Sequence, residues 1–170
     1  MIEFVALDTI DGAAVEDLLD RAFGADRFAR TAYAVRGSAS SIAPLSFAAI
    51  DDGRLVGTIQ CWPVLLSADD GTRHDLVMIG PVAVEPDRQR DGIGRMLMTH
   101  LLRAAHATQR DAAMMLIGDP EYYGRFFGFA AERTGGWRLP GPVERRRLLA
   151  KGGPVPAIPG VLGPRIDGVA

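Results

Sequence analysis

A chain of 170 residues, 48% hydrophobic and 24% charged, accommodates one domain that buries most of its apolar surface, without room for a second. The formal net charge of −2 gives no support to a nucleic-acid partner, which requires a strongly basic face. No apolar run approaches the ~20 residues that a membrane span needs, so we expect a globular protein that binds neither nucleic acid nor membrane.

The N-terminal residues lack the basic segment and apolar stretch of a secretory signal peptide. A single cysteine, Cys61, excludes an internal disulfide and is compatible with a reducing compartment. The histidines lack the spacing to cysteines or carboxylates that metal sites require. We therefore predict a cytoplasmic protein without a metal, in which Cys61 is a small core residue.

The N-terminal part of the chain predicts one strand and two helices. Residues 3–7 alternate as a short strand, and Asp11 precedes a helix over residues 12–23 with apolar side chains at helical spacing. Residues 26–36 predict a second helix, followed by a serine-rich loop over residues 37–44.

Three strands follow and should form an antiparallel meander. They are predicted over residues 46–50, residues 55–64 and a long segment that ends at Val84. The Asp-Gly step at positions 52 and 53 favours a tight hairpin turn, and residues 69–71 mark the next turn.

The strand that ends at Val84 leads into an amphipathic helix through a loop that contains Gly92 and Gly94. Without side chains there, the unpaired N–H groups at the helix start and the positive end of the helix dipole suit a phosphate or pyrophosphate. Three arginines add positive charge around the same point: Arg88, Arg90 and Arg95. The residues expected to form the buried side of the helix are Ile93, Leu97, Leu101, Ala104 and Thr108.

Two common nucleotide-binding motifs do not fit this loop. A P-loop ends in Gly-Lys-Ser/Thr, and the only lysine of the chain is Lys151. The dinucleotide fingerprint requires a third glycine where Leu97 stands.

Residues 114–117 predict a short strand after this helix. A crossover that contains a helix favours parallel pairing with the strand that ends at Val84. Two parallel neighbours that diverge leave a slot for an extended ligand.

The pattern Gln89-x-x-Gly92-x-Gly94, after a strand that ends in Val-Ala-Val-Glu-Pro, resembles the acyl-CoA-binding motif of the GNAT N-acetyltransferase superfamily. Residues 119–129 resemble the tyrosine and Gly-Phe element of that family, and Gly80-Pro81 resembles its bacterial YhbS-like branch. The resemblance covers residues 1–150. It implies a mixed α/β (α+β) fold with a central, mostly antiparallel sheet flanked by helices, in which splayed parallel strands form the acyl-CoA slot.

The resemblance also implies how acetyl-CoA is bound as a co-substrate. Its pantetheine would pair with backbone groups at the strand edge over residues 82–84, and the glycine loop would hold the pyrophosphate. The implied cofactor-binding residues are Val82, Ala83, Val84, Gln89, Arg90, Asp91, Gly92, Ile93, Gly94 and Arg95.

Direct attack of an amine on the thioester requires management of two protons. Tyr123 is predicted to protonate the leaving thiolate, with Tyr122 as the alternative. Family members commonly place three residues between the tyrosine and the Gly-Phe pair, whereas four separate Tyr123 from Gly128. The general base stays open between water and three nearby ionisable residues: His74, Asp75 and Asp119.

The predicted function is acyl-CoA-dependent N-acetyltransfer, with acetyl-CoA as the expected donor, to a primary amine of a small molecule. Two alternatives stay open: a non-catalytic acyl-CoA-binding or regulatory protein, and an N-acetyltransferase for proteins or peptides. Because the family places the region of residues 26–44 over the acceptor cleft, Phe28, Tyr33 and Arg36 are candidate substrate contacts, although packing roles are more common for such residues.

The C-terminal part is less informative. Residues 145–149 predict a short helix with an exposed basic face. Residues 151–170 contain four prolines and five glycines, which predicts no regular element. We expect this tail to pack on the body of the chain or on a neighbouring subunit, in which case the protein is a homodimer.

Overall fold

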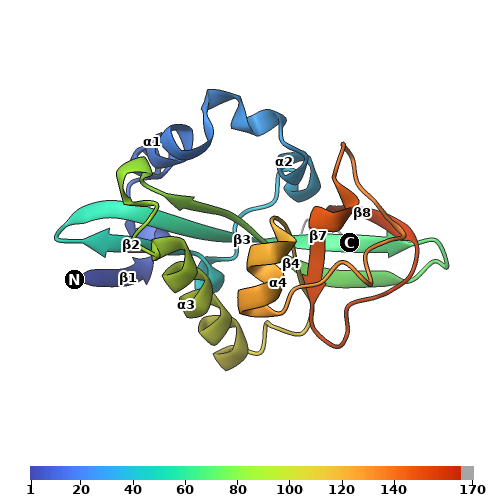
Figure 1. The fold of residues 1–170 in the computed structure, drawn as a ribbon. Coiled ribbons are helices and arrows are strands. Elements are labelled where there is room, and N and C mark those ends of the chain that lie inside the picture. The colour runs from blue at the N-terminus through green and yellow to red at the C-terminus, as the bar shows by residue number, and fades with distance from the viewer. Residues whose placement is uncertain (166–170) are drawn as a thin grey trace. The chain divides into compact units, whose positions relative to one another are not determined.

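The computed structural model describes residues 1–165, which form two compact units, each assembled from separate stretches of chain (Figure 1). The first unit comprises Met1–Phe28, Ser41–Cys61 and Gly80–Gln109. The second comprises Ala29–Ser40, Trp62–Ile79 and the chain from Arg110 onward. No helix in residues 1–165 has the length and hydropathy to cross a membrane.

The first unit contains two helices and the strands that lead to the glycine loop. These elements are β1 (Ile2–Ala6), α1 (Gly12–Phe23), β2 (Phe47–Asp51), the start of β3 (Arg54–Ala68), the end of β4 (Arg73–Val84) and α3 (Ile93–Ala107). Strand β2 pairs antiparallel with both β1 and β3. The predicted hairpin turn is confirmed, because Asp52 and Gly53 have φ angles of 49° and 79°.

Helix α1 has the bounds and the buried side that the sequence predicts. The Asp11 carboxylate caps it by accepting a hydrogen bond from the Ala13 N–H at 3.4 Å. Val15, Leu18 and Leu19 are buried in a cluster with residues of β2 and β4. Burial of this stripe, rather than helix propensity, fixes α1 on the first unit.

Helix α3 lies against β2 and buries Ile93, Leu97 and Leu101 as predicted (Figure 1). At its C-terminal end the prediction differs, since Ala105 is buried, Ala104 is half-buried and Thr108 is exposed. The buried side continues in four-residue steps from Leu101 to Ala105, whereas the predicted side takes a three-residue step to Ala104.

The absence of a side chain at Gly57 of β3 allows α3 to approach the sheet closely. A Cβ atom there would lie 2.9 Å from Ile93 Cγ2, 3.0 Å from Leu97 Cδ1 and 3.1 Å from the Ala83 carbonyl oxygen. These separations are shorter than the ~3.5–4.0 Å of favourable carbon contacts. Gly57 therefore fixes the position of the first turns of α3.

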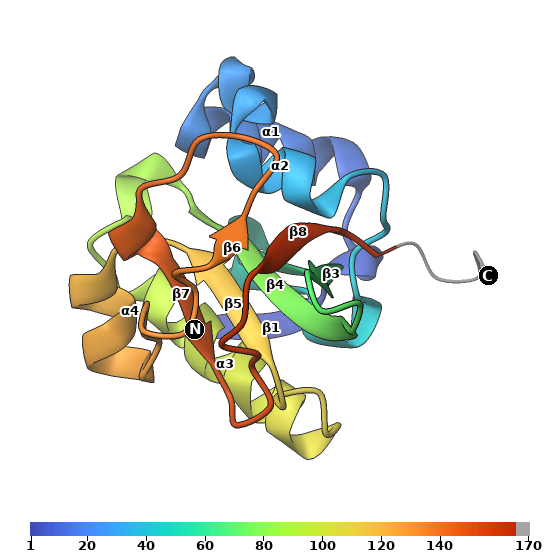
Figure 2. The same cartoon turned by 90° about the vertical axis from the view of Figure 1, so that its right-hand side faces the viewer.

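The second unit contains the remaining parts of β3 and β4, one helix from the N-terminal half of the chain and the elements after α3. These are α2 (Thr31–Arg36), β5 (Met114–Ile117), α4 (Pro120–Phe127), β6 (Trp137–Arg138), β7 (Leu148–Lys151) and β8 (Gly160–Pro164). Strand β5 lies between β4 and β7 (Figure 2). Its predicted parallel pairing with β4 is confirmed: Val77 pairs with Met114, and Met78 pairs with Met115.

The hydrogen-bonded strands follow the order β1-β2-β3-β4-β5-β7, and β8 pairs with β3 and β6. Strand β8 contradicts the prediction that the tail forms no regular element. Leu162 of β8 lies opposite Leu66 of β3 in an antiparallel ladder and is buried beside Trp137. A long partner strand and burial outweigh the glycine and proline content of the segment. Residues 166–170 of the predicted tail lie outside the described residues.

Two predicted helices are also corrected. The helix expected over residues 26–36 is a 3-10 segment, Ala25–Ala29, followed by α2, with Arg30 in an extended conformation between them. Buried Arg27 forms ion pairs with Glu16 and Asp20 of α1, which holds the first segment in place. In the expected helix over residues 145–149, only Arg145–Arg147 form a 3-10 turn, because the apolar residues that follow enter β7.

Replacement of Gly57 tests the close approach of α3. We expect Gly57→Ala to destabilise the protein by about 1–3 kcal/mol, because the added methyl group overpacks the contact with Ile93 and Leu97. Urea unfolding followed by circular dichroism measures the change. Gly163→Ala in β8 is the control, since its Cβ would meet no atom within 4 Å, and a loss as large as that of Gly57→Ala would contradict the interpretation.

Candidate active site

The loop between β4 and α3 presents the start of the helix without a capping side chain. Gly92 is the N-cap residue of α3, in the left-handed conformation with φ 77° and ψ 14°, and no side chain accepts the capping hydrogen bond. The left-handed conformation favours glycine at this position. Because the first N–H groups of a helix have no partner within the helix, the α3 N-terminus offers donors to an anion.

The space at Gly92 is open, whereas Gly94 lies against side chains of β4. A Cβ atom at Gly92 would meet nothing within 4 Å, and one at Gly94 would have Val84 Cγ2 at 3.6 Å and Val82 Cγ1 at 3.8 Å as its nearest neighbours. The helix start therefore adjoins the strand edge at Val82 and Val84. An anionic group that approaches the amides meets no obstructing side chain at either glycine, so the loop fits a phosphate or pyrophosphate.

The predicted cofactor-binding residues divide by the direction of their side chains. Ala83 and Ile93 are fully buried, so only their backbone groups are available to a ligand. Four of the predicted residues have exposed side chains: Gln89, Arg90, Asp91 and Arg95.

Arg88 braces the loop, which differs from its predicted role as a cationic arm for a phosphate. Its guanidinium forms an ion pair with Asp51 at 3.0 Å and another with Asp91 of the loop. Asp51 also accepts a hydrogen bond from the Met1 ammonium at 3.0 Å, and that ammonium, followed by Arg88, lowers the pKa of the Asp51 carboxyl. Arg88 thus ties the loop to the β2–β3 hairpin and neutralises the charge of Asp91.

Glu85 anchors the end of β4 to α1. Its buried carboxylate accepts two hydrogen bonds from the Arg21 guanidinium, at 2.7 and 2.9 Å. This bidentate pair lowers the pKa of the Glu85 carboxyl below its usual value. The N–H of Glu85 donates to the Val56 carbonyl oxygen at 2.9 Å. The residue before the glycine loop is therefore fixed by both its backbone and its side chain.

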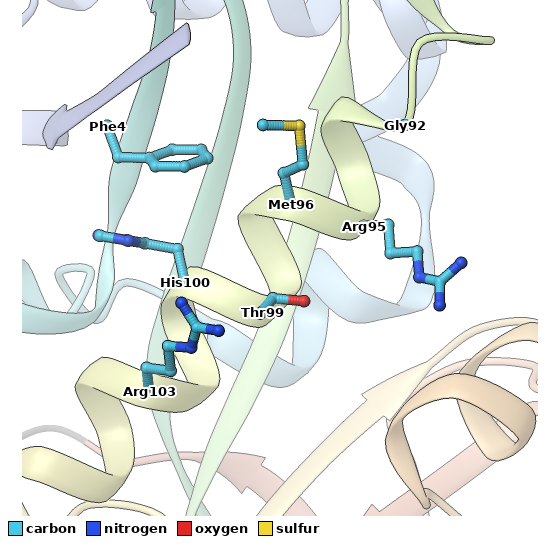
Figure 3. A pocket seen from close by; sticks show the side chains of 7 residues that line it. All are labelled: Phe4, Gly92, Arg95, Met96, Thr99, His100 and Arg103. Carbon is cyan, nitrogen blue, oxygen red and sulfur yellow. The ribbon is translucent and has the colours of Figure 1, made fainter.

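A pocket of about 350 Å³ extends from Gly92 along α3 to Arg103 (Figure 3). The His100 ring forms one wall. It stacks on the Phe4 ring with 4.6 Å between the ring centroids and lies edge-on to the Phe47 ring with 4.5 Å between the centroids. Burial, followed by the charge of Arg103, lowers the pKa of the His100 imidazole. The positive charge of this pocket at neutral pH therefore comes from Arg95 and Arg103, and the pocket is suited to a negatively charged part of a ligand.

The two candidate tyrosines lie on α4, which belongs to the second unit. The helix is regular through Phe127 and ends at Gly128, so the additional residue of the Tyr-to-Gly-Phe spacing forms no bulge. The Tyr123 ring packs over Gly118, where a Cβ atom would lie 2.5 Å from the ring carbon Cε2. Burial, followed by the proximity of Tyr122, raises the pKa of the Tyr123 hydroxyl to about 12. Tyr123 is therefore a protonated donor at neutral pH.

The three residues considered as general bases take part in local structure. The Asp119 carboxylate caps α4 by accepting a hydrogen bond from the Glu121 N–H at 3.0 Å. A hydrogen bond with the Glu121 side chain, followed by this backbone bond, lowers the pKa of the Asp119 carboxyl and weakens it as a base. Asp75 forms an ion pair with Arg165 at 3.0 Å, and the His74 ring shares a hydrogen bond with the Thr72 hydroxyl at 2.8 Å.

The remaining residues singled out by the sequence have packing contacts. Cys61 is fully buried, and burial raises the pKa of its thiol, which confirms the predicted core role. The Arg36 guanidinium lies 3.9 Å from the ring centroids of both Tyr33 and Trp62, so Tyr33 and Arg36 stack within the second unit. Phe28 is 60% exposed. Within residues 1–165, no group of three His, Cys, Asp or Glu side chains could hold a metal ion.

Comparison with known proteins identifies the family and the fold. The model of the acetyltransferase (GNAT) family matches residues 13–129. The GNAT family N-acetyltransferase YhbS from Escherichia coli, in complex with CoA, is 22% identical, with a TM-score of 0.69 over 97% of this chain and 89% of that chain. A GNAT family acetyltransferase from Brucella melitensis, in complex with acetyl-CoA, is 24% identical, with a TM-score of 0.65 over 97% and 96%.

A more distant similarity joins the chain to the ribosomal-protein-S18-alanine N-acetyltransferase from Escherichia coli. The identity is 20%, and the TM-score is 0.53 over 88% of this chain and 90% of that chain. No curated protein matches the sequence. At these identities the solved structures establish a shared fold, which confirms the predicted mixed sheet flanked by helices.

The pair between Arg21 and Glu85 predicts a pH-dependent contribution to stability. Because the pKa of Glu85 is lowered in the folded protein, the pair stabilises the fold above the pKa of the unfolded chain, ~4.3, and this contribution is lost as the pH falls through the lowered value. We expect Glu85→Gln to lower the urea midpoint of unfolding at pH 7. The difference in midpoint between the variant and the unmodified chain should become smaller under acidic conditions.

Glu121→Gln is the matched control, because its carboxylate pairs with Arg146 at an exposed position and should contribute little. If the difference in urea midpoint between Glu85→Gln and the unmodified chain is the same at neutral and acidic pH, the pair with Arg21 does not stabilise the fold through its charges.

Proposed function

The chain belongs to the GNAT acetyltransferase family, and on that premise we propose that it transfers an acetyl group from acetyl-CoA to a primary amine of a small molecule. The observation that carries the proposal is the start of α3, where Gly92 leaves the helical N–H groups uncapped and the space at Gly92 is open. Two relatives of the same fold hold CoA or acetyl-CoA in their structures.

In this proposal the loop binds the pyrophosphate mainly through its backbone. The N–H groups of Gly92, Ile93 and Gly94 donate to the phosphate oxygens, with the positive end of the α3 dipole behind them. Gln89, Arg90 and Arg95 add side-chain contacts from exposed positions. The carboxylate of Asp91 would repel a phosphate, but its ion pair with Arg88 offsets that charge.

The pantetheine would pair with the backbone at the edge of β4. Val82 and Val84 have side chains close to Gly94, so this edge and the phosphate-binding amides lie next to each other. Ala83 contributes only backbone groups, because its side chain is fully buried. An extended chain of amides on a strand edge uses the same hydrogen bonds as an added strand.

Acetyl-CoA supplies an activated thioester, so the residues of the protein need only position the reactants and manage protons. The neutral amine nitrogen forms a bond to the acetyl carbon, the C–S bond breaks, and CoA leaves as the thiolate. The N-acetylated product loses one proton to solvent, and the thiolate takes one proton from solvent. Tyr123, with its pKa of about 12, donates a hydrogen bond to the sulfur as negative charge develops. Its pKa exceeds the ~8.5 of a thiol, so stabilisation through a hydrogen bond is favoured over full transfer of the phenolic proton.

A carboxylate at the phosphate position tests binding of the co-substrate. We expect Gly94→Glu to weaken acetyl-CoA binding by at least about 100-fold, because it places negative charge where the phosphates bind. Isothermal titration calorimetry measures the affinity. Gly12→Glu, at the first residue of α1 with nothing within 4 Å of its Cβ, is the matched control and should bind as the unmodified chain does. Equal affinities of both variants would refute the assignment of the loop.

Removal of the Tyr123 hydroxyl tests the donor. We expect Tyr123→Phe to lower kcat by about 100-fold while the Kd of acetyl-CoA stays within about twofold, because the hydroxyl acts on the developing thiolate. Gly118→Ala should lower kcat in the same way, since the methyl group displaces the Tyr123 ring. Steady-state kinetics decide the role, and normal turnover of Tyr123→Phe with loss in Tyr122→Phe would move it to Tyr122.

The same assays separate the alternatives. Binding of acetyl-CoA without turnover on any small amine or peptide would identify a regulatory binding protein, whereas turnover on peptides alone would identify a protein N-acetyltransferase.

A further inference from the structure

The second unit contains a pocket of about 580 Å³ between the start of α2 and the segment that leads into β7. Its apolar walls include Ala32, Ile117 and Val143, and its charged lining consists of Arg30, Glu144 and Arg147. The Thr31 hydroxyl donates a hydrogen bond to the Pro142 carbonyl oxygen at 2.6 Å, which holds the two sides of the pocket together. A volume of this size, with apolar walls and few charged groups, is typical of a small-molecule site.

The charged run at positions 144–147 separates into structural and pocket-lining residues. The Arg145 guanidinium donates to the Trp137 carbonyl oxygen, and the Arg146 guanidinium pairs with Glu121. Glu144 and Arg147 instead line the pocket, and in the described part of the chain neither side chain forms an ion pair. Arg145, Arg146 and Arg147 are exposed, as the sequence predicts, but the sequence does not indicate which of them has a partner within the protein.

The pocket adjoins the predicted hydrogen-bond donor of the reaction. Ile117 lines it, and the next residue, Gly118, lies directly under the Tyr123 ring. The Gly118 N–H donates to the Arg147 carbonyl oxygen at 2.9 Å, and the Arg147 guanidinium is close enough to Tyr123 to oppose the rise of its pKa. A ligand in this pocket therefore meets Arg147, whose charge also acts on Tyr123.

We propose that this pocket binds the acetyl acceptor and selects amines that also carry a carboxylate, as amino acids do. Arg147 pairs with the carboxylate, Glu144 pairs with the ammonium group as the acceptor arrives, and the apolar walls contact the remaining side chain. Glu144 and Arg147 thus present one charge of each sign to the acceptor. This inference rests on the proposed N-acetyltransferase function.

Three acceptors of similar size measure how much the carboxylate contributes to kcat/KM. Phenylalanine carries the carboxylate, whereas phenylalaninamide and phenethylamine lack it. We expect kcat/KM to be at least about tenfold higher for phenylalanine than for the other two, because Arg147 has no carboxylate to pair with in the other two acceptors. Arg147→Gln should raise the KM for phenylalanine about tenfold with little change in kcat, and leave phenethylamine within about twofold. Glu144→Gln should raise the KM of all three, since each carries an ammonium group.

Arg146→Gln is the matched control, because Arg146 belongs to the same turn but pairs with Glu121 outside the pocket. Its kinetics should equal those of the unmodified chain. Equal use of the three acceptors, or an equal effect of Arg147→Gln on all of them, would overturn the inference while leaving N-acetyltransfer intact.

Absence of turnover with every amine would count against the proposed function, and the pocket is then tested by binding alone. Saturation-transfer NMR with phenylalanine should show binding to the unmodified chain and to Arg146→Gln, with loss of the signal in Arg147→Gln. No phenylalanine signal with the unmodified chain would refute the pocket itself.

Discussion

The close contact between α3 and the sheet at Gly57 is the constraint on which the candidate phosphate site depends. Because no side chain separates β3 from the first turns of α3, Ile93 and Leu97 approach the strand closely at Gly57. The helix start is thereby brought to the end of β4, with Gly94 beside Val82 and Val84. The edge of β4 and the N–H donors of α3 therefore lie next to each other because Gly57 has no side chain.

Charged residues around the loop serve mainly to hold it in place. Glu85 is fixed to Arg21, and Arg88 joins Asp51 and Asp91, so the segment before the glycines has an anchor at each end. Preorganisation of this kind lowers the cost of ordering a loop when an anion binds. Arg95 and Arg103, which line the pocket along α3, provide positive charge in the proposed phosphate-binding region.

Local signals in the sequence predicted much of the fold. The Asp11 cap, the Asp52-Gly53 turn and the parallel pairing of β5 all follow from short-range rules, and the structure confirms them. Strand β8 could not be predicted, because its glycines and prolines disfavour a strand and only pairing with the long β3 overcomes that preference.

The site was predictable to the extent that it is made of backbone. Two glycines at a helix start indicate exposed amides wherever they occur, and the position of the loop followed from them. The role of Arg88 and the division of residues 144–147 depend on partners such as Asp51 and Trp137, which are distant in sequence or not marked by any local pattern. A single sequence indicates which charges are present but not which of them have internal partners.

The most direct test of the account is a titration of ¹⁵N-labelled protein with acetyl-CoA, followed through assigned backbone amide resonances. Amides at the α3 N-terminus should shift most, in particular those of Gly92, Ile93 and Gly94, because their N–H groups are proposed to donate to the phosphates. Gly163, in β8 of the second unit, is the internal reference and should shift little. Absence of binding, or binding that leaves the three loop amides unshifted, would contradict the central claim.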